Sequence, residues 1–257
     1  ALLPCARLSC RVFFSLNSQE LPEVFEDAMD AWFGGFRELL VLDPDPALVA
    51  ALDAKTGDDS APNALDEVKA AVCDNINLYV EKNEEEFQRF LQTFVGDAWR
   101  LLTRTGLDPR RDRVVASASK FLTAVANSVH HGLFGDEDTL KQICESIVIP
   151  NVQFREEERE LFEMNWVEYA RRDVEGSDAE TRRKAACELA KALTNKFPDA
   201  MLRSVGAYAT ALLQQHANDP AGGSWKAKDA AMSLVIAVAA KSRTNARGAT
   251  ETRAIPA

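Results

Sequence analysis

Hydrophobic residues recur along the whole chain at helical spacing, three or four positions apart. The stretch from 87 to 102 is typical, because its phenylalanines and leucines fall on one stripe and its charged residues on the other side. No stretch alternates every second residue as a half-buried strand would. The pattern therefore predicts helices only. They lie at about 21–40, 65–79, 87–102, 114–125, 140–147, 186–193, 201–212 and 231–238.

Polar residues and prolines mark the expected helix boundaries. Asp108 followed by Pro109 predicts an N-cap with proline in the first turn. Ser177 with Glu180 three residues later is a capping box, which predicts a helix start there and a non-helical segment before it. Ser224 follows a loop containing proline and two glycines, and it is the expected cap of the last helix.

The helices show signs of an internal repeat. The tripeptide Asp-Ala-Trp at 30–32 recurs at 97–99, and Ala-Ala pairs occur at 185–186 and 230–231. The two tripeptides lie 67 positions apart, and this spacing falls to the mid-forties when the excess length of the acidic segment at 43–63 is subtracted. The two Ala-Ala pairs lie 45 positions apart. Two helices per unit and a period of about 40–47 are typical of HEAT and armadillo repeats. We therefore predict an all-α chain that forms a right-handed α-α superhelix, a HEAT-repeat solenoid.

This interpretation divides the chain into a half-repeat and about four helix pairs within one solenoid. The pairs lie at about 20–82, 84–130, 136–197 and 198–243, with insertions at 43–63 and 150–177. The first insertion is poor in aromatic residues, and we expect a solvated loop. The second contains Phe154, Phe162, Trp166 and Tyr169, so we expect it to bury apolar surface and be ordered. Both chain ends read as internal edges of a longer protein.

Composition narrows the function classes. The chain is 46% hydrophobic and 27% charged, as folded proteins are, and its formal net charge is -10. This charge argues against nucleic acid as a partner, since phosphates require a basic surface. It suits basic protein partners, although solubility alone also explains it. No stretch of about 20 apolar residues is present, so we expect no membrane insertion.

The sequence offers no catalytic residue, metal site or cofactor motif. The five cysteines are scattered without a CxxC pair, and we interpret them as structural, reduced thiols. The three histidines lack the HExxH spacing, and the glutamate runs at 84–86 and 156–158 are typical of helix starts. No phosphate-binding loop and no GxSxG motif occurs. We therefore expect a protein that is not an enzyme.

Two charged segments remain as candidate contacts. The segment 108–113 (DPRRDR) is either an exposed, salt-bridged face or a partner contact. The segment 169–186 places two arginine pairs on either side of an acidic turn. Arginine suits bidentate carboxylate contacts, which orient a partner as well as bind it. The alternative is an internal charge network that holds the insertion in place, and the two interpretations are compatible.

The motifs FFSLNSQELPEVFEDAMDAW, EEEFQRFLQTFV, ICESIVIPNVQFR and EYARRDVEGSDAETRRKAACELAKAL resemble the importin-α re-exporters, a family within the importin-β superfamily. The resemblance implies a nuclear export receptor that shuttles between nucleus and cytoplasm, contacts nuclear pore proteins, and holds importin-α together with Ran-GTP. It also implies that the second insertion contacts these partners and acts as a hinge. The matching candidate residues are Tyr169, Arg171, Arg172, Asp173, Glu175, Asp178, Arg182 and Arg183.

Two other functions stay open. The first is a different HEAT scaffold, such as another transport receptor or a phosphatase-type structural subunit. The second is an all-helical enzyme. The motif does not separate residues that touch Ran from those that touch importin-α or brace the hinge.

Overall fold

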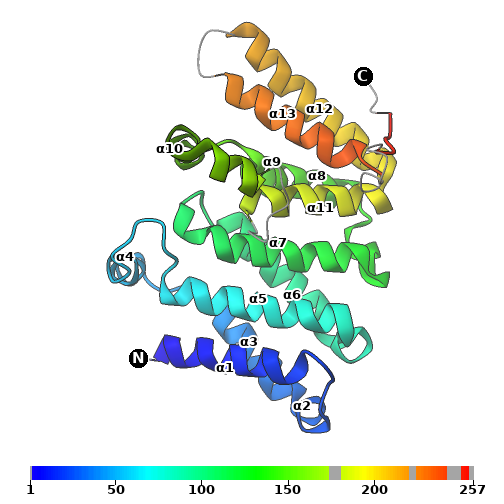
Figure 1. The fold of residues 1–257 in the computed structure, drawn as a ribbon. Helices are drawn as coiled ribbons and strands as arrows, with labels where there is room; N and C mark the ends of the chain where they lie inside the picture. The colour runs from blue at the N-terminus through cyan, green and yellow to red at the C-terminus, as the bar shows by residue number, and fades with distance from the viewer. Residues whose placement is uncertain (1, 174–180, 220–223, 242–249, 255–257) are drawn as a thin grey trace. The chain divides into compact units, whose positions relative to one another are not determined.

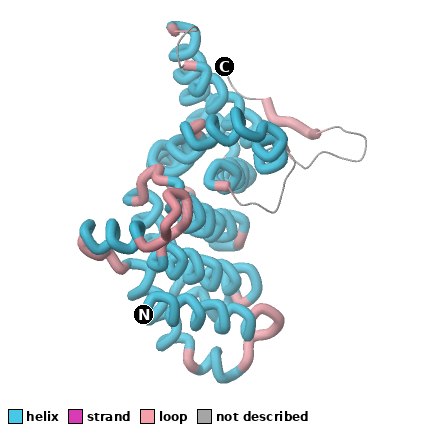
Figure 2. Tube along the Cα trace, turned by 60° about the vertical axis from the view of Figure 1, so that its left-hand side comes forward, coloured by secondary structure: helices cyan, strands magenta, loops and turns pink. Residues whose placement is uncertain are grey.

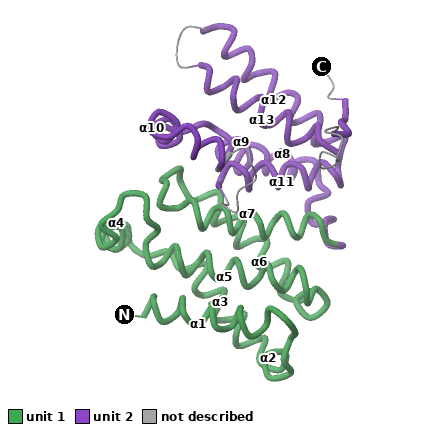
Figure 3. Tube along the Cα trace, viewed as in Figure 1, with its two compact units in different colours: residues 1–128 green, residues 129–257 purple. Residues whose placement is uncertain are grey.

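The computed structural model describes residues 2–173, 181–219, 224–241 and 250–254 (Figure 1). Throughout these residues the regular structure is helical, apart from one isolated antiparallel bridge between Ala240 and Thr252 (Figure 2). The chain divides into two compact units, residues 1–128 and 129–257 (Figure 3). The all-α prediction is confirmed, while the partition into four helix pairs stays a prediction.

Unit 1 is organised around one buried helix, α5 (Ala64–Lys82), which packs against four others. Helices α1 and α7 lie along two of its sides, and α3 and α6, which also pack on each other, cover a third. The buried residues of α5 occupy almost its whole circumference, as expected of a helix enclosed by neighbours. The other helices of this unit are α1 (Leu2–Asn17), α2 (Glu23–Asp27), α3 (Met29–Val41), α4 (Pro46–Ala54), α6 (Glu84–Arg104), the 3-10 turn Pro109–Arg111 and α7 (Asp112–Asn127).

Aromatic rings from α1, α3, α5 and α6 form the centre of unit 1. Phe33 is fully buried, and its ring centroid lies 4.9 Å from Tyr79 and 5.0 Å from Phe87. The hydroxyl of Tyr79 donates to Asn17 Oδ1 at 3.0 Å, so the polar end of this buried ring is satisfied. Burial raises the pKa of Tyr79 to about 12.

The segment 43–63 corrects two expectations. It contains helix α4, which begins at Pro46 and is capped by Asp45, whose side chain accepts from Ala47 N at 2.8 Å. From α4, Asp53 accepts two hydrogen bonds from Arg111, at 2.9 and 2.7 Å, and Arg111 also contacts Asp66 of α5. The segment therefore contains a short helix held by an ionic cluster, although most of its residues are exposed as expected, and 108–112 is partly buried rather than an exposed face.

The described part of unit 2 contains an interrupted helix followed by four long ones. Pro150 has no N–H to donate to the turn before it, and that turn widens into a π-helix, closed by Ile149 N to Cys144 O. Helix α11 packs on the π-helix, α9, α12 and α13. The elements are the 3-10 helix Val129–Phe134, α8 (Glu137–Ile143), the π-helix Cys144–Val148, α9 (Ile149–Val152), α10 (Glu156–Asp173), α11 (Arg182–Lys196), α12 (Pro198–Asn218) and α13 (Trp225–Ala239).

Helix boundaries were the less accurate part of the prediction. The Asp108 cap is confirmed, because its side chain accepts from Arg110 N at 2.9 Å. The expected helix at 21–40 is divided at Ala28. Helix α11 is capped by Thr181, whose Oγ1 accepts from Lys184 N at 3.1 Å, whereas Ser177 lies outside the described residues. Ser224 makes no capping bond and instead donates to the carbonyl of Asp219.

The cysteines are reduced throughout. Cys10, Cys73 and Cys144 are buried, and burial raises the pKa of Cys10 to about 11 and that of Cys144 to about 12. These three behave as small apolar residues, as predicted. Cys5 differs, because it is exposed.

Replacing Phe33 tests the aromatic centre. Phe33→Ala removes a fully buried ring that contacts three helices, and we expect it to lower the free energy of unfolding by about 3–5 kcal/mol. Urea denaturation followed by far-ultraviolet circular dichroism measures this change. Val24→Ala, at an exposed position, should change the free energy by less than about 0.5 kcal/mol. Equal effects of the two variants would contradict the assignment.

Replacing Arg111 tests the ionic cluster. Arg111→Ala leaves two largely buried carboxylates, Asp53 and Asp66, without their shared cation, and we expect a loss of about 3–5 kcal/mol. Limited proteolysis should then cut within 43–63 faster than in the parent chain. Arg113→Ala is the control, because its pair with Asp74 is exposed and should contribute little. Unchanged cleavage of Arg111→Ala would show that α4 is held by other contacts.

Candidate functional site

The candidate site is the segment from Phe154 to Arg183 in unit 2, most of which is helix α10. This helix consists of two helical pieces that meet at Asn165, whose backbone is extended (φ −154°, ψ 77°). The side chain of Asn165 accepts from Glu168 N at 3.1 Å. Asparagine is a preferred N-cap, so Asn165 ends one piece of α10 and starts the next.

The base of α10 is attached to the start of α13. Phe154 is buried, and its ring meets Trp225 edge-on at a centroid distance of 4.9 Å. Glu156 pairs with Lys226 at 3.1 Å. Tyr169, from the second piece of α10, lies half-buried at 5.9 Å from Phe154. These contacts give the insertion an ordered base, and the expectation that 150–177 is ordered is confirmed for residues 150–173.

The middle of α10 carries an apolar surface that the described residues of unit 2 leave largely exposed. Met164 is 86% exposed and Trp166 64% exposed, and Phe162 and Val167 are each half exposed. We call these four residues the α10 apolar surface. The sequence predicted that the four aromatic residues of this segment would bury apolar surface. Phe154 is buried and Tyr169 is half-buried, Phe162 meets Tyr169 edge-on at 5.5 Å, and Trp166 is mostly exposed.

Acidic residues surround this surface. Glu157, Glu160 and Glu163 are exposed on the first piece of α10. Arg159 pairs with Glu156 at 2.8 Å and lies 3.4 Å from Glu163, so it offsets part of this charge. The surface therefore combines large apolar side chains with a negative surround, which favours an apolar partner surface that carries basic residues.

Arg171 is the candidate arginine that the structure leaves accessible. Its side chain is 64% exposed and its guanidinium lies 3.9 Å from Glu168. Arg172 and Asp173 end α10, and their side chains are not among those described. Glu175 and Asp178 lie outside the described residues.

Arg182 and Arg183 have a different environment, because both are buried in the first turn of α11. Arg182 donates to Asn151 Oδ1 at 3.0 Å, and Asn151 in turn donates to Ile147 O at 2.6 Å. Arg183 donates to Asp229 at 2.6 Å and to Ser233, both on α13. Their guanidinium groups therefore tie α11 to α9 and α13, as the internal-network alternative described.

The sequence contained a signal that separates the two arginine pairs. Arg182 lies four and seven positions before Ala186 and Leu189, which places it on the buried stripe of the same helix. Arg183 precedes Ala186 and Ala190 by three and seven positions. Helical periodicity, rather than residue type, marks these arginines as internal.

Within the described parts of the chain, no cluster of histidine, cysteine and acidic side chains is arranged to hold a metal ion. The described helices likewise include none with the length and apolar character that a bilayer crossing requires.

Comparison with known proteins identifies the family. The family model described as Cse1 matches residues 1–255. This chain belongs to the Cse1 family. Exportin-2 of Homo sapiens is 41% identical over 245 residues, which are 95% of this chain and 24% of that protein. Exportin-2 of Drosophila melanogaster is 42% identical over 243 residues, 94% of this chain and 24% of that protein.

A solved structure, described as the exportin Cse1 in its cargo-free, cytoplasmic state, has the same fold. It matches with a TM-score of 0.88 and 30% identity, over 98% of this chain and 26% of that one. The resemblance found in the sequence and the HEAT-repeat fold are thereby confirmed. The chain spans about a quarter of the length of the Cse1-family relatives that it matches.

Substitutions at the two arginine pairs should differ in their effect on stability. Arg183→Ala removes a buried guanidinium that bonds Asp229 and Ser233, and because the Asp229 side chain is itself 34% exposed we expect a loss of about 1–3 kcal/mol in the free energy of unfolding. Arg171→Ala, at an exposed position, should change it by less than about 0.5 kcal/mol. Urea denaturation of the two variants measures both. A stable Arg183→Ala chain would show that this network contributes little.

Proposed function

We propose that this chain is part of a nuclear export receptor that carries importin-α to the cytoplasm in a complex with Ran-GTP. The observation that carries the proposal is the match along nearly the whole chain to exportin-2 proteins and to the exportin Cse1. On this proposal the complete protein shuttles between nucleus and cytoplasm and contacts nuclear pore proteins. It acts through protein contacts, without enzymatic activity and without nucleic acid.

We propose further that α10 is a contact surface for Ran or importin-α. Aromatic residues and arginine carry a large share of the binding energy in protein interfaces. Trp166, Phe162 and Arg171 supply these residue types, exposed, on an element whose base is fixed to α13. Among the residues proposed from the sequence, Tyr169, Arg171, Arg172 and Asp173 lie on α10 itself, and Glu175 and Asp178 follow it in the chain.

Arg182 and Arg183 take a supporting part in this proposal. Their bonds to Asn151 and Asp229 hold the first turn of α11, which follows the insertion in the chain. Arg182 and Arg183 are the residues that would brace the hinge, because their bonds hold the helix that follows the insertion against α9 and α13. A partner that binds one arrangement better than the other shifts the balance between them by its differential affinity. Coupling between two such partners is reciprocal.

A different HEAT-repeat scaffold, such as another karyopherin or a phosphatase-type subunit, is the alternative. Precipitation of the complete protein from lysate, with and without a non-hydrolysable GTP analogue, separates the two. An export receptor should retain importin-α only when GTP-bound Ran is present. Retention that is independent of the nucleotide would favour the alternative.

Variants of α10 test the contact surface in the complete protein. The double variant Arg171→Ala, Arg172→Ala should weaken the complex with Ran-GTP and importin-α by about 2–5 kcal/mol if both side chains are desolvated against carboxylates, and by much less at a rim. Trp166→Ala should cost at least about 1 kcal/mol, as anchor residues do. Isothermal titration calorimetry of each partner with the other held at saturation gives these values.

The matched control is Arg203→Ala. Arg203 is about as exposed as Arg171, lies on α12, and pairs with Glu137 at 2.8 Å. It should leave both affinities unchanged. Wild-type affinity of the Trp166→Ala and arginine variants for both partners would remove α10 from the interface, without changing the family assignment.

A further inference from the structure

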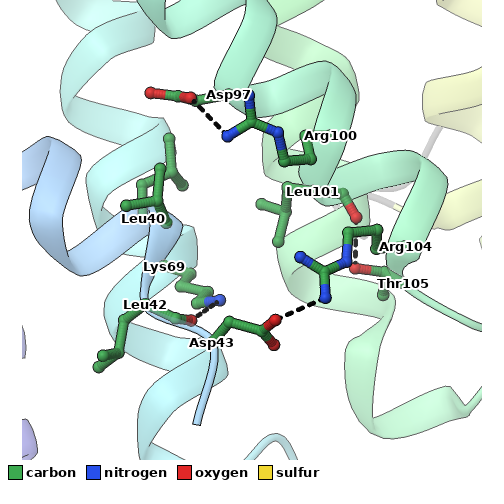
Figure 4. Close-up of a pocket in the computed structure, with 10 residues that line it drawn as sticks. Leu40, Leu42, Asp43, Lys69, Asp97, Arg100, Leu101, Arg104 and Thr105 are labelled. Atoms are coloured by element: carbon green, nitrogen blue, oxygen red, sulfur yellow. Dashed lines mark hydrogen bonds and ion pairs between the residues drawn. The ribbon is translucent and has the colours of Figure 1, made fainter.

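A polar pocket in unit 1 has no part in the proposal above. It lies where the last turns of α3 and α6 meet the side of α5 (Figure 4). Three cationic side chains line it: Lys69 from α5, and Arg100 and Arg104 from α6. In Figure 4 Asp43, in the residues after α3, points into the space between Lys69 and Arg104.

The pocket has more hydrogen-bond donors than its own acceptors use. Lys69 Nζ donates to Leu42 O at 2.7 Å, which caps the end of α3. Arg104 donates to Asp43 at 2.5 Å, and Arg100 makes a long contact of 3.4 Å with Asp97. An ammonium and two guanidinium groups carry many N–H donors and no acceptor, so most of their donors are left to solvent or a ligand. The ligand that fits is an oxyanion.

The two carboxylates of the pocket differ in how firmly they are held. Asp97 is buried and also receives Arg37 at 2.8 Å, so it belongs to the packing of α3 against α6. Asp43 and Arg104 are 64% and 62% exposed, and an ion pair in that position contributes only about 0.2–1 kcal/mol. An external carboxylate can therefore replace Asp43 at little cost.

Part of the pocket rim is apolar. Val41 and Leu42 are exposed at the end of α3, and they line the pocket together with Leu101 of α6. This rim suits the apolar neighbours of an acidic residue in a peptide better than a hydrated free ion.

We propose that this pocket binds an acidic side chain from a protein segment that alternates acidic and apolar residues. Asp43 is the internal occupant, and the incoming carboxylate replaces it on Arg104 while it also faces Lys69 and Arg100. The apolar residues on either side of the acid contact Val41, Leu42 and Leu101. Burial lowers the pKa of Lys69, and a bound carboxylate opposes this effect by stabilising the ammonium form.

The test uses the 257-residue chain and a defined probe. The peptide acetyl-Leu-Glu-Leu-Glu-Leu-amide is titrated into protein with 13C-labelled leucine methyl groups, and the resonances of Leu40, Leu42 and Leu101 are followed. We expect saturable shifts at these leucines. The same peptide with glutamine in place of glutamate, and inorganic phosphate at equal ionic strength, are the comparison ligands.

Three variants locate the binding. Asp43→Asn removes the internal competitor and should tighten binding about two- to fivefold, the equivalent of an exposed ion pair. Arg104→Gln should weaken it about two- to fivefold, because it removes one exposed ion pair with the bound carboxylate. Arg89→Gln is the matched control, because Arg89 lies on the same helix in an exposed pair with Asp30 at 3.2 Å, outside the pocket.

Each remaining outcome overturns the proposal. If neither the wild type nor Asp43→Asn shows saturable shifts, the pocket does not bind the peptide. Equal binding by the glutamine peptide would show that the protein does not recognise the carboxylate. Equal effects of Arg104→Gln and Arg89→Gln would show that the peptide does not bind in this pocket. Phosphate that saturates these resonances when the peptide does not removes the protein segment as ligand. None of these results bears on α10 or on the export proposal.

Discussion

The structure of unit 1 depends on the burial of helix α5 on nearly every side. Buried residues lie around almost the whole circumference of α5, so the surrounding helices must enclose it and its buried polar residues need partners. The aromatic rings of α1, α3 and α6 close the space around Tyr79, and the polar atoms trapped there are satisfied locally, as in the bond from Tyr79 to Asn17. The positions of α4, of the ionic cluster and of the polar pocket all follow from that enclosure.

Arginine has two distinct tasks in this chain. Arg111, Arg182 and Arg183 lie inside their units, where each guanidinium joins helices through carboxylate or amide oxygens. Such groups are costly to bury unless every charge is paired, so their removal costs more than the bond itself contributes. Arg171 and Arg104 are exposed, and their bonds are weak enough to be exchanged for those of a partner. The exposure of each arginine, rather than its residue type, therefore distinguishes those that stabilise the fold from those proposed to bind a partner.

Helix α10 shows how a repeat protein of this family combines order with an uncovered apolar surface. Phe154 and Glu156 fix its base to α13, and Asn165 restarts the helix after the kink. The residues around that kink are then held outward, with Trp166 and Met164 largely in solvent. A large exposed apolar group on an ordered element is typical of an interaction site, because its contact with water is unfavourable unless a partner covers it.

The sequence by itself determined the all-α fold class and the family, because both depend on local periodicity and on motifs that run along the chain. It also determined that Asp108 caps a helix start, since capping involves neighbouring residues only. Tertiary structure alone decided that Asp53 meets Arg111 and Asp66, that Phe154 rather than Trp166 is the anchor, and that Arg183 reaches Asp229. Each of these joins residues far apart in the chain, and only the packing of helices brings their side chains within bonding distance.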